Sequence, residues 1–158
     1  MRDWRLWLLC SAAVIALDLL TKHWVVQAFS YGDSLPLTSY FNLVRAHNSG
    51  AAFSFLAGAG GWQRLFFIAV ASIAAAVILN LLRKHHRETL FSLALSLVLG
   101  GALGNLIDRI RWGYVVDFLD FFYGTYHWPA FNVADMAITG GVMLLILDSL
   151  VKAKDKKP

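Results

Sequence analysis

The sequence predicts an all-α membrane protein in which four transmembrane helices carry a small extracytoplasmic β-sheet and an aromatic-rich outer loop. Of its 158 residues, 58% are hydrophobic and only 15% are charged, and the mean hydropathy is +0.58, which is unusual for a soluble domain. Four windows are also long and apolar enough to cross a hydrocarbon layer about 30 Å thick, which takes roughly 20 helical residues. The windows are approximately 6–29, 65–82, 90–107 and 133–151. We expect one integral membrane domain, 1–158, with outer segments 30–64 and 108–132.

The first window follows two arginines, as a secretory signal would, but no small-residue cleavage site ends it. We therefore interpret it as a retained span. Within it, Asp18 and Lys22 are four residues apart with the acid first, which is the favourable helical order for an ion pair. We interpret this pair as structural, holding the outer end of the span against loops; the alternative is that Lys22 is a general base. The only cysteine, Cys10, lies inside the span, so an intrachain disulfide is excluded.

The basic residues predict the orientation in the membrane. The net charge is +4, and basic side chains flank the windows on one side: Arg2, Arg5, Arg83, Lys84, Arg87, Lys152, Lys154, Lys156 and Lys157. By the positive-inside rule this side is cytoplasmic, which places both termini there and the two longer segments outside. Basic residues beside a span serve mainly as a topology signal, so we expect no nucleic-acid partner.

The segment 30–64 is too long to be a simple connection. Between residues 37 and 55 it is rich in strand-favouring residues on both sides of a turn-like Asn48-Ser49-Gly50, which predicts a small sheet or hairpin on the membrane surface. Gly58, Gly60 and Gly61 then provide a flexible return to the second window. That window is rich in alanine and uncharged, so we expect it to contribute packing.

The third window contains Gly100 and Gly104 at the small-xxx-small spacing that lets helices approach closely. A phosphate-binding loop would need a preceding strand and a fuller glycine pattern. Further along, four residues are spaced by three or four positions and so share one helical face, which is polar near its outer end; they are Gly101, Asn105, Asp108 and Arg109. The segment 110–130 is dense in aromatic residues, which suits the headgroup region.

Asp117 and Asp135 are the candidate catalytic residues. Both lie in apolar sequence near the predicted outer surface, and an apolar environment disfavours the charged form of a carboxyl group. Two such groups brought together can share one proton and activate a water for attack on an amide carbonyl. The alternative is that Asp135 only stabilises a helix N-terminus, while Asp117 is solvated.

The remaining polar residues also allow more than one interpretation. Arg109 either compensates Asp108, reaches inward to a substrate carbonyl, or is a structural partner for buried carbonyls. Three asparagines either orient a peptide backbone or cap helices and turns; they are Asn48, Asn105 and Asn132. Asp148 is expected at the cytoplasmic interface. The histidines lack metal-ligand spacing, so we expect no metal and no cofactor.

The residues alone leave three rival functions. An ion transporter would need a polar path through the membrane midplane, whereas the polar residues here gather in the outer third of the predicted spans. A non-catalytic lipid-binding or assembly subunit would account for the aromatic residues and glycines without the two aspartates. A serine hydrolase would use Ser49 or Ser54 with Lys22 as its base.

Five motifs, in this order and on four spans, resemble bacterial lipoprotein signal peptidase, also called signal peptidase II. They are Asp18-x-x-x-Lys22, Asn48-Ser-Gly-Ala-Ala-Phe-Ser54, Gly104-Asn105-Leu-x-Asp108-Arg109, Val115-Val-Asp117-Phe118 and Phe131-Asn132-x-Ala-Asp135. The resemblance implies a membrane aspartyl endopeptidase of the bacterial inner membrane that cleaves prolipoproteins just before a diacylglyceryl-modified cysteine.

The same resemblance assigns roles to individual residues. It makes Asp117 and Asp135 the catalytic pair near the outer membrane face. It also implies binding or supporting roles for seven further residues: Asn48, Asn105, Arg109, Asn132, Asp18, Lys22 and Asp108. The implied partners are diacylglyceryl-prolipoprotein substrates, membrane lipid and globomycin-type inhibitors.

Overall fold

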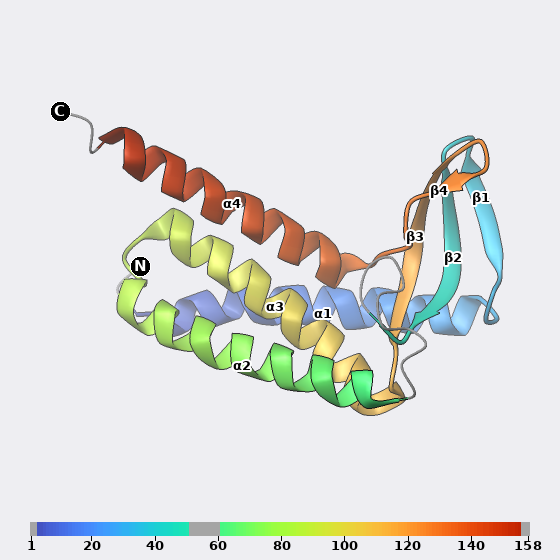
Figure 1. Ribbon diagram of the computed structural model, residues 1–158, viewed down its shortest axis with the longest axis horizontal. Helices are drawn as coiled ribbons and strands as arrows, with labels where there is room; N and C mark the ends of the chain where they lie inside the picture. Colours follow the sequence, from blue (N-terminus) through green and yellow to red (C-terminus); the bar gives the residue numbers. More distant parts are fainter. Residues whose placement is uncertain (1–2, 51–60, 156–158) are drawn as a thin grey trace.

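A computed structural model describes residues 3–50 and 61–155, and these form four long helices with a small sheet at one end (Figure 1). The helices are α1 (Arg5–Ala28), α2 (Trp62–His85), α3 (Thr89–Trp112) and α4 (Val133–Asp155). All four are long and apolar enough to cross a membrane, so the predicted spans are present. The first turn of α1 and the last turn of α4 both lie at the end away from the sheet (Figure 1).

The sheet is antiparallel and has the order β1-β2-β3-β4. Its strands are β1 (Ser34–Thr38), β2 (Phe41–Asn48), β3 (Val115–Tyr123) and β4 (Tyr126–His127). Strands β1 and β2 form a hairpin in the first outer segment, as expected, but its turn lies at Ser39 and Tyr40. The predicted turn at Asn48-Ser49-Gly50 is wrong as a hairpin turn, because β2 ends there, and the residues expected to follow it lie outside the described residues. The expectation of a loop for 108–132 is corrected: α3 continues to Trp112, and most of the aromatic residues that follow lie in β3 and β4. Aromatic and β-branched residues favour strands once a partner strand is available, and β2 supplies it from a remote part of the chain.

Helix α3 is the central element of the bundle and packs against α1, α2 and α4. In its spanning window 56% of residues are buried, against 11–22% in the other three helices. Glycines make this packing possible: a Cβ added at Gly100 would lie 2.7 Å from the Val14 Cβ on α1. At Gly101 it would lie 2.3 Å from the Ala134 carbonyl oxygen on α4. Within the described chain, Gly100 therefore packs inside the bundle, and the close helix approach that its spacing predicts is formed with α1.

The start of α2 differs from the sequence-based boundary. Helix α2 begins at Trp62, so Arg64 lies in its first turn rather than in the outer segment. The Arg64 guanidinium donates to the backbone carbonyls of Arg109 (2.9 Å) and Ile110 (2.8 Å). Carbonyls at a helix C-terminus have no intrahelical donor, so this arginine caps α3. Gly61 precedes α2 with φ +98°; Gly58, Gly60 and the rest of 51–60 lie outside the described residues.

Candidate active site

Lys22 is the centre of a buried charge network between α1 and α3. Its ammonium donates to Asp18 Oδ2 at 2.7 Å and to Asn105 Oδ1 at 2.9 Å, and it lies 3.0 Å from Asp108 Oδ2. Lys22, Asp18 and Asp108 are each 3% exposed or less. The predicted ion pair between Asp18 and Lys22 is therefore confirmed, but it joins helices rather than holding loops.

Asp18 also connects this network to α4. Its Oδ1 accepts a hydrogen bond from the Ala134 backbone N–H at 2.9 Å. The close approach requires a residue without a side chain on α3, because a Cβ at Gly104 would lie only 2.6 Å from Asp18 Oδ2. The second glycine of the small-xxx-small motif thus gives the carboxylate room between three helices.

Asp117 lies on β3 and is buried, with 3% of its surface exposed, so the alternative of a solvated carboxylate is wrong. Asn132 Nδ2 donates to its Oδ1 at 2.7 Å, and Asn48 Nδ2 donates to its Oδ2 at 3.0 Å. Burial, followed by the charge of Asp135, raises the pKa of Asp117 to about 7, although the two asparagine hydrogen bonds and Lys22 oppose the shift. This carboxyl group can hold a proton at neutral pH.

Asp135 lies in the first turn of α4. Asn105 Nδ2 donates to its Oδ1 at 2.8 Å, and the Asn132 backbone N–H donates to its Oδ2 at 3.3 Å. In return, the Asp135 N–H donates to Asn132 Oδ1 at 3.0 Å. This reciprocal arrangement is a capping box, so the helix-terminus interpretation of Asp135 holds. It does not exclude the pair, since Asp135 also acts electrostatically on Asp117.

Arg109 points toward the segment that contains Asn48 and does not pair with Asp108, whose partner is Lys22. Its Nη2 donates to the Gly50 carbonyl at 2.9 Å, and its guanidinium carbon lies 4.9 Å from the centre of the Phe67 ring. Among the described residues, its buried Nε has no hydrogen-bond partner. The seven supporting residues thus gather around the two aspartates, on α1, α3, β2 and the turn before α4.

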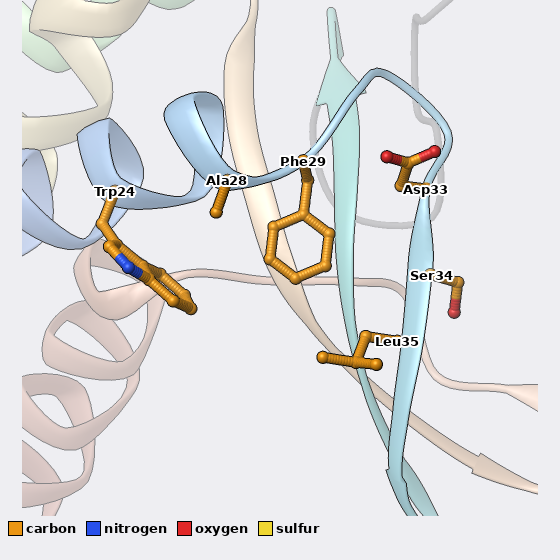
Figure 2. Close-up of a pocket in the computed structure, with 6 residues that line it drawn as sticks. All are labelled: Trp24, Ala28, Phe29, Asp33, Ser34 and Leu35. Carbon is orange, nitrogen blue, oxygen red and sulfur yellow. The ribbon is translucent and has the colours of Figure 1, made fainter.

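A hollow of about 500 Å³ lies elsewhere, between the end of α1 and β1 (Figure 2). In Figure 2 the side chains of Trp24, Phe29 and Leu35 face a shared space beside the Asp33 carboxylate. None of the nine predicted site residues lines this hollow. Because activation of a water for attack on an amide needs groups that exchange protons, we place the candidate site at the carboxylates of Asp117 and Asp135 rather than at this hollow.

Several observations concern residues away from the carboxylates. No group of three or more potential metal ligands occurs among residues 3–50 and 61–155. Asp148 forms an ion pair with Lys152 at 2.7 Å, near the end of α4 that is remote from the sheet.

Sequence reasoning missed two arginines. Arg64 caps α3, and Arg45 Nη1 donates to the Phe29 carbonyl at 2.8 Å. Arg64 was assigned to a loop, and only its place directly before an apolar window signals a role at the helix start.

The fold and the site define a multi-pass membrane protein with buried carboxylates at the sheet end of its helical bundle. The family model described as signal peptidase (SPase) II matches residues 10–151. The chain belongs to this family, which consists of aspartic endopeptidases that process lipoproteins, and it is therefore a multi-pass inner-membrane protein of a bacterium. The predicted family and fold class are confirmed.

Individual relatives agree with this assignment. A lipoprotein signal peptidase of Cupriavidus taiwanensis is 54% identical over 149 residues, covering 94% of this chain and 85% of the relative. One of Ralstonia nicotianae is 55% identical over 148 residues, with 94% and 86% covered. A bacterial membrane enzyme solved by the in meso method at 2.3 Å resolution matches with a TM-score of 0.86 and 33% identity, covering 96% of this chain and 91% of that one. A second such structure, at 1.9 Å resolution, has a TM-score of 0.80, 33% identity, and 91% and 92% covered.

Proposed function

We propose that the chain removes signal peptides from diacylglyceryl-modified prolipoproteins by cutting just before the lipidated cysteine, with Asp117 and Asp135 as its catalytic dyad. The observation that carries this proposal is that Asn132 donates to both carboxylates, through its side chain to Asp117 and through its backbone N–H to Asp135. One residue thereby holds two acidic groups in a common site. A carboxyl pKa of about 7 beside a second carboxylate supports a shared proton.

The proposed reaction needs only the dyad and one water. The ionised aspartate takes a proton from the water, whose oxygen bonds to the scissile carbonyl carbon, while the protonated aspartate polarises the carbonyl oxygen. The amide nitrogen then takes a proton from the pair as the C–N bond breaks, which leaves a new carboxylate and a free amino group on the lipidated cysteine. The shared proton belongs to the pair rather than to one residue. No cofactor enters this scheme.

We assign the supporting residues to two groups. The three asparagines hydrogen-bond the two carboxylates, and Arg109 interacts electrostatically with both. These residues would hold the peptide backbone and the developing oxyanion, since preorganised polar groups of this kind stabilise the transition state. Asp18, Lys22 and Asp108 are the scaffold, because they contact one another, Asn105, and the backbone of β3 and α4, and none of them bonds directly to Asp117 or Asp135. In this arrangement the scaffold holds α1, α3 and α4 around the dyad.

The basic residues at one end of the bundle indicate how the protein is oriented in the membrane, and the position of Asn105 along α3 indicates the depth of the site. With both termini on the cytoplasmic side, the sheet end of the bundle faces outward. Asn105 lies seven residues before the end of α3, which places it about 10 Å below that end at 1.5 Å per residue. A diacylglyceryl group in the surrounding membrane lipid would hold the scissile bond at this depth. Globomycin-type inhibitors would occupy the same site, and we propose no nucleic-acid partner.

The rival functions do not account for the findings. Membership of a peptidase family sets aside a transporter and a non-catalytic subunit. A serine hydrolase would need a neutral Lys22 as base, but this ammonium donates to Asp18 and Asn105 and pairs with Asp108. Replacing Ser49 with alanine tests this serine directly, and Ser54 lies outside the described residues.

The test is cleavage of a diacylglyceryl-modified prolipoprotein by the purified wild type and by the Asp117→Asn and Asp135→Asn variants. Asparagine keeps the shape of the side chain but cannot accept or pass the proton, so both variants should lose turnover while keeping membrane insertion and thermal stability. Asp120→Asn is the matched control, because Asp120 lies on the same strand and is buried but bonds instead to Asn42 and His127. Near-normal turnover by either folded dyad variant would remove that residue from the mechanism.

A further inference from the structure

The ring of His47 lies between two tyrosine rings next to the candidate active site. Its centroid is 3.9 Å from that of Tyr114, with the planes 19° apart, and 4.5 Å from that of Tyr31, with the planes 32° apart. Tyr31 belongs to the connection between α1 and β1, and Tyr114 lies between α3 and β3. The stack therefore joins β2 to the connection before β1 and to the remote segment between α3 and β3.

The His47 ring is held in its neutral form. Burial, together with the charge of Arg45, lowers the pKa of His47 below its ordinary value. Among the described residues its Nε2 is buried without a hydrogen-bond partner, so an imidazolium would place an unsatisfied N–H there. The ring thus acts in the stack as an uncharged aromatic plate.

The stack lies near the end of β2, beyond the last residue that bonds to the β1 side. Regular pairing of β1 with β2 ends at Ser34 and Val44, and backbone hydrogen bonds of Arg45 with Gly32 and Asp33 extend this contact by one residue. Strand β3 continues to pair with β2 as far as Asn48. The end of β2 that carries Asn48 therefore has a partner strand on one side only. His47 contacts Tyr114 and Tyr31 at this point, and so restrains the strand where regular pairing is incomplete.

Asn48 follows His47 directly and has both ends of its side-chain amide engaged. Its Oδ1 accepts from the Gly50 N–H at 3.0 Å, and its Nδ2 donates to Asp117 Oδ2 at 3.0 Å. A hydrogen bond depends steeply on distance and angle. A shift at the end of β2 would consequently weaken the bond to Asp117.

We propose that His47 is a positioning residue: its stack with Tyr31 and Tyr114 holds the Asn48 amide against the carboxylate of Asp117. The inference rests on the proposed dyad function and assigns to it a residue outside the predicted site. What the position requires is a flat, uncharged ring rather than a proton donor.

The kinetic consequence has a definite sign. The Asn48 hydrogen bond favours ionised Asp117 and lowers its pKa against the effect of burial. Loosening that bond raises the pKa of the pair, so the alkaline limb of the pH–rate profile moves to higher pH while kcat falls. Other charged groups act on Asp117 from α4 (Asp135), α1 (Lys22) and α3 (Arg109), and a change at His47 leaves them in place.

The experiment measures kcat, KM and the pH–rate profile of purified full-length variants on a diacylglyceryl-modified prolipoprotein. His47→Ala should lower kcat by roughly 10- to 100-fold, the range expected for a displacement near 1 Å, with KM changed less than about twofold. His47→Phe should recover most of that loss. In the Asn48→Ala background, His47→Ala should cause little further change, because residues that act through one contact are not additive. Tyr40→Ala, which removes a stack with Tyr123 elsewhere on the sheet, is the matched control.

Each outcome decides the proposal. A His47→Phe variant as slow as His47→Ala would show that the ring nitrogens matter and would overturn the proposal. A loss of kcat in the double variant equal to the product of the losses from His47→Ala and Asn48→Ala would also overturn it. If His47→Ala does not fold, Tyr31→Leu at an exposed position should reproduce the shift in the pH profile with a smaller change in kcat. Loss of activity in Asp117→Asn with normal kinetics in His47→Ala would refute this inference and leave the dyad intact.

Discussion

The carboxylate of Asp18 in α1 accepts a hydrogen bond from the backbone N–H of Ala134 in α4, at 2.9 Å and across 116 positions of sequence. The first N–H groups of a helix have no intrahelical acceptor. Asn132 supplies an acceptor for the Asp135 N–H, and Asp18 supplies one from another helix. The charge network of α1 is thereby tied to the helical turn that carries Asp135.

Asp18→Ala should lower the free energy of unfolding by about 3–5 kcal/mol, because it leaves the buried Lys22 with one carboxylate fewer and removes the acceptor of Ala134. Asp18→Asn keeps an oxygen acceptor for Ala134 but loses the charge and the oxygen that accepts from Lys22, so its loss should be smaller than that of Asp18→Ala. Unfolding in detergent, followed by heat or denaturant, measures both. Equal losses in the two variants would show that the Ala134 bond contributes nothing.

Two adjacent glycines on α4 offer a matched comparison of helix packing. A Cβ at Gly141 would lie 2.6 Å from Val98 Cγ2 and 2.7 Å from the Ala94 carbonyl oxygen, whereas a Cβ at Gly140 meets nothing within 4 Å. Gly141→Ala should therefore destabilise the protein by about 1–3 kcal/mol through overpacking. Gly140→Ala should be neutral or stabilising by up to about 1 kcal/mol, since alanine favours helix. Unfolding midpoints measure this difference, and equal midpoints would contradict the close packing of α4 on α3.

The parts of the fold that were predictable depend on neighbours in the sequence. Hydropathy located four helices because each span is one continuous apolar stretch. The pair of Asp18 and Lys22 follows from four-residue spacing, and the capping box of Asn132 and Asp135 from three-residue spacing.

What was missed depends on contacts between remote segments. Strand β3 was expected to be a loop, because its partner β2 precedes it by two helices and no local pattern indicates the pairing of Phe41 with Phe121. Likewise, Lys22 had a predicted partner in Asp18, but its contact with Asp108 requires α1 and α3 to be adjacent. The motif resemblance indicated which residues matter, whereas their mutual contacts came from the structure.

The activity should have an alkaline limb set by Asp117. Its pKa is raised to about 7, so the proton that polarises the carbonyl is present below that pH and is lost as the pH rises through it. We expect kcat/KM to fall about tenfold per pH unit above this limb. A pH–rate profile of the wild type measures the limb, and Asp120→Asn should leave it in place. A rate that is flat between pH 6 and pH 9, in roughly the range where this proton is lost, would contradict a shared proton on the pair.

Lys22→Met separates the dyad from a serine mechanism. The ammonium donates to Asp18 and Asn105 and pairs with Asp108, so its removal should cost about 3–5 kcal/mol of stability. The fraction that remains folded should still turn over within about tenfold of the wild type, since the dyad performs the proton transfers. Its alkaline limb should move to higher pH, because the Lys22 charge favours ionised Asp117.

The serine mechanism predicts a different pattern for the same variant. Without its base, turnover should fall by a factor on the order of 10⁴, and Ser49→Ala or Ser54→Ala should cause a matching loss. Lys152→Met is the control for removing a lysine ion pair, because Lys152 pairs with Asp148 and Glu88 but is about half exposed and lies in the last turn of α4, at the opposite end of the helix from Asp135. If folded Lys22→Met and one serine variant are both inactive while Asp117→Asn keeps turnover, the nucleophile is that serine, and the aspartates only support the structure.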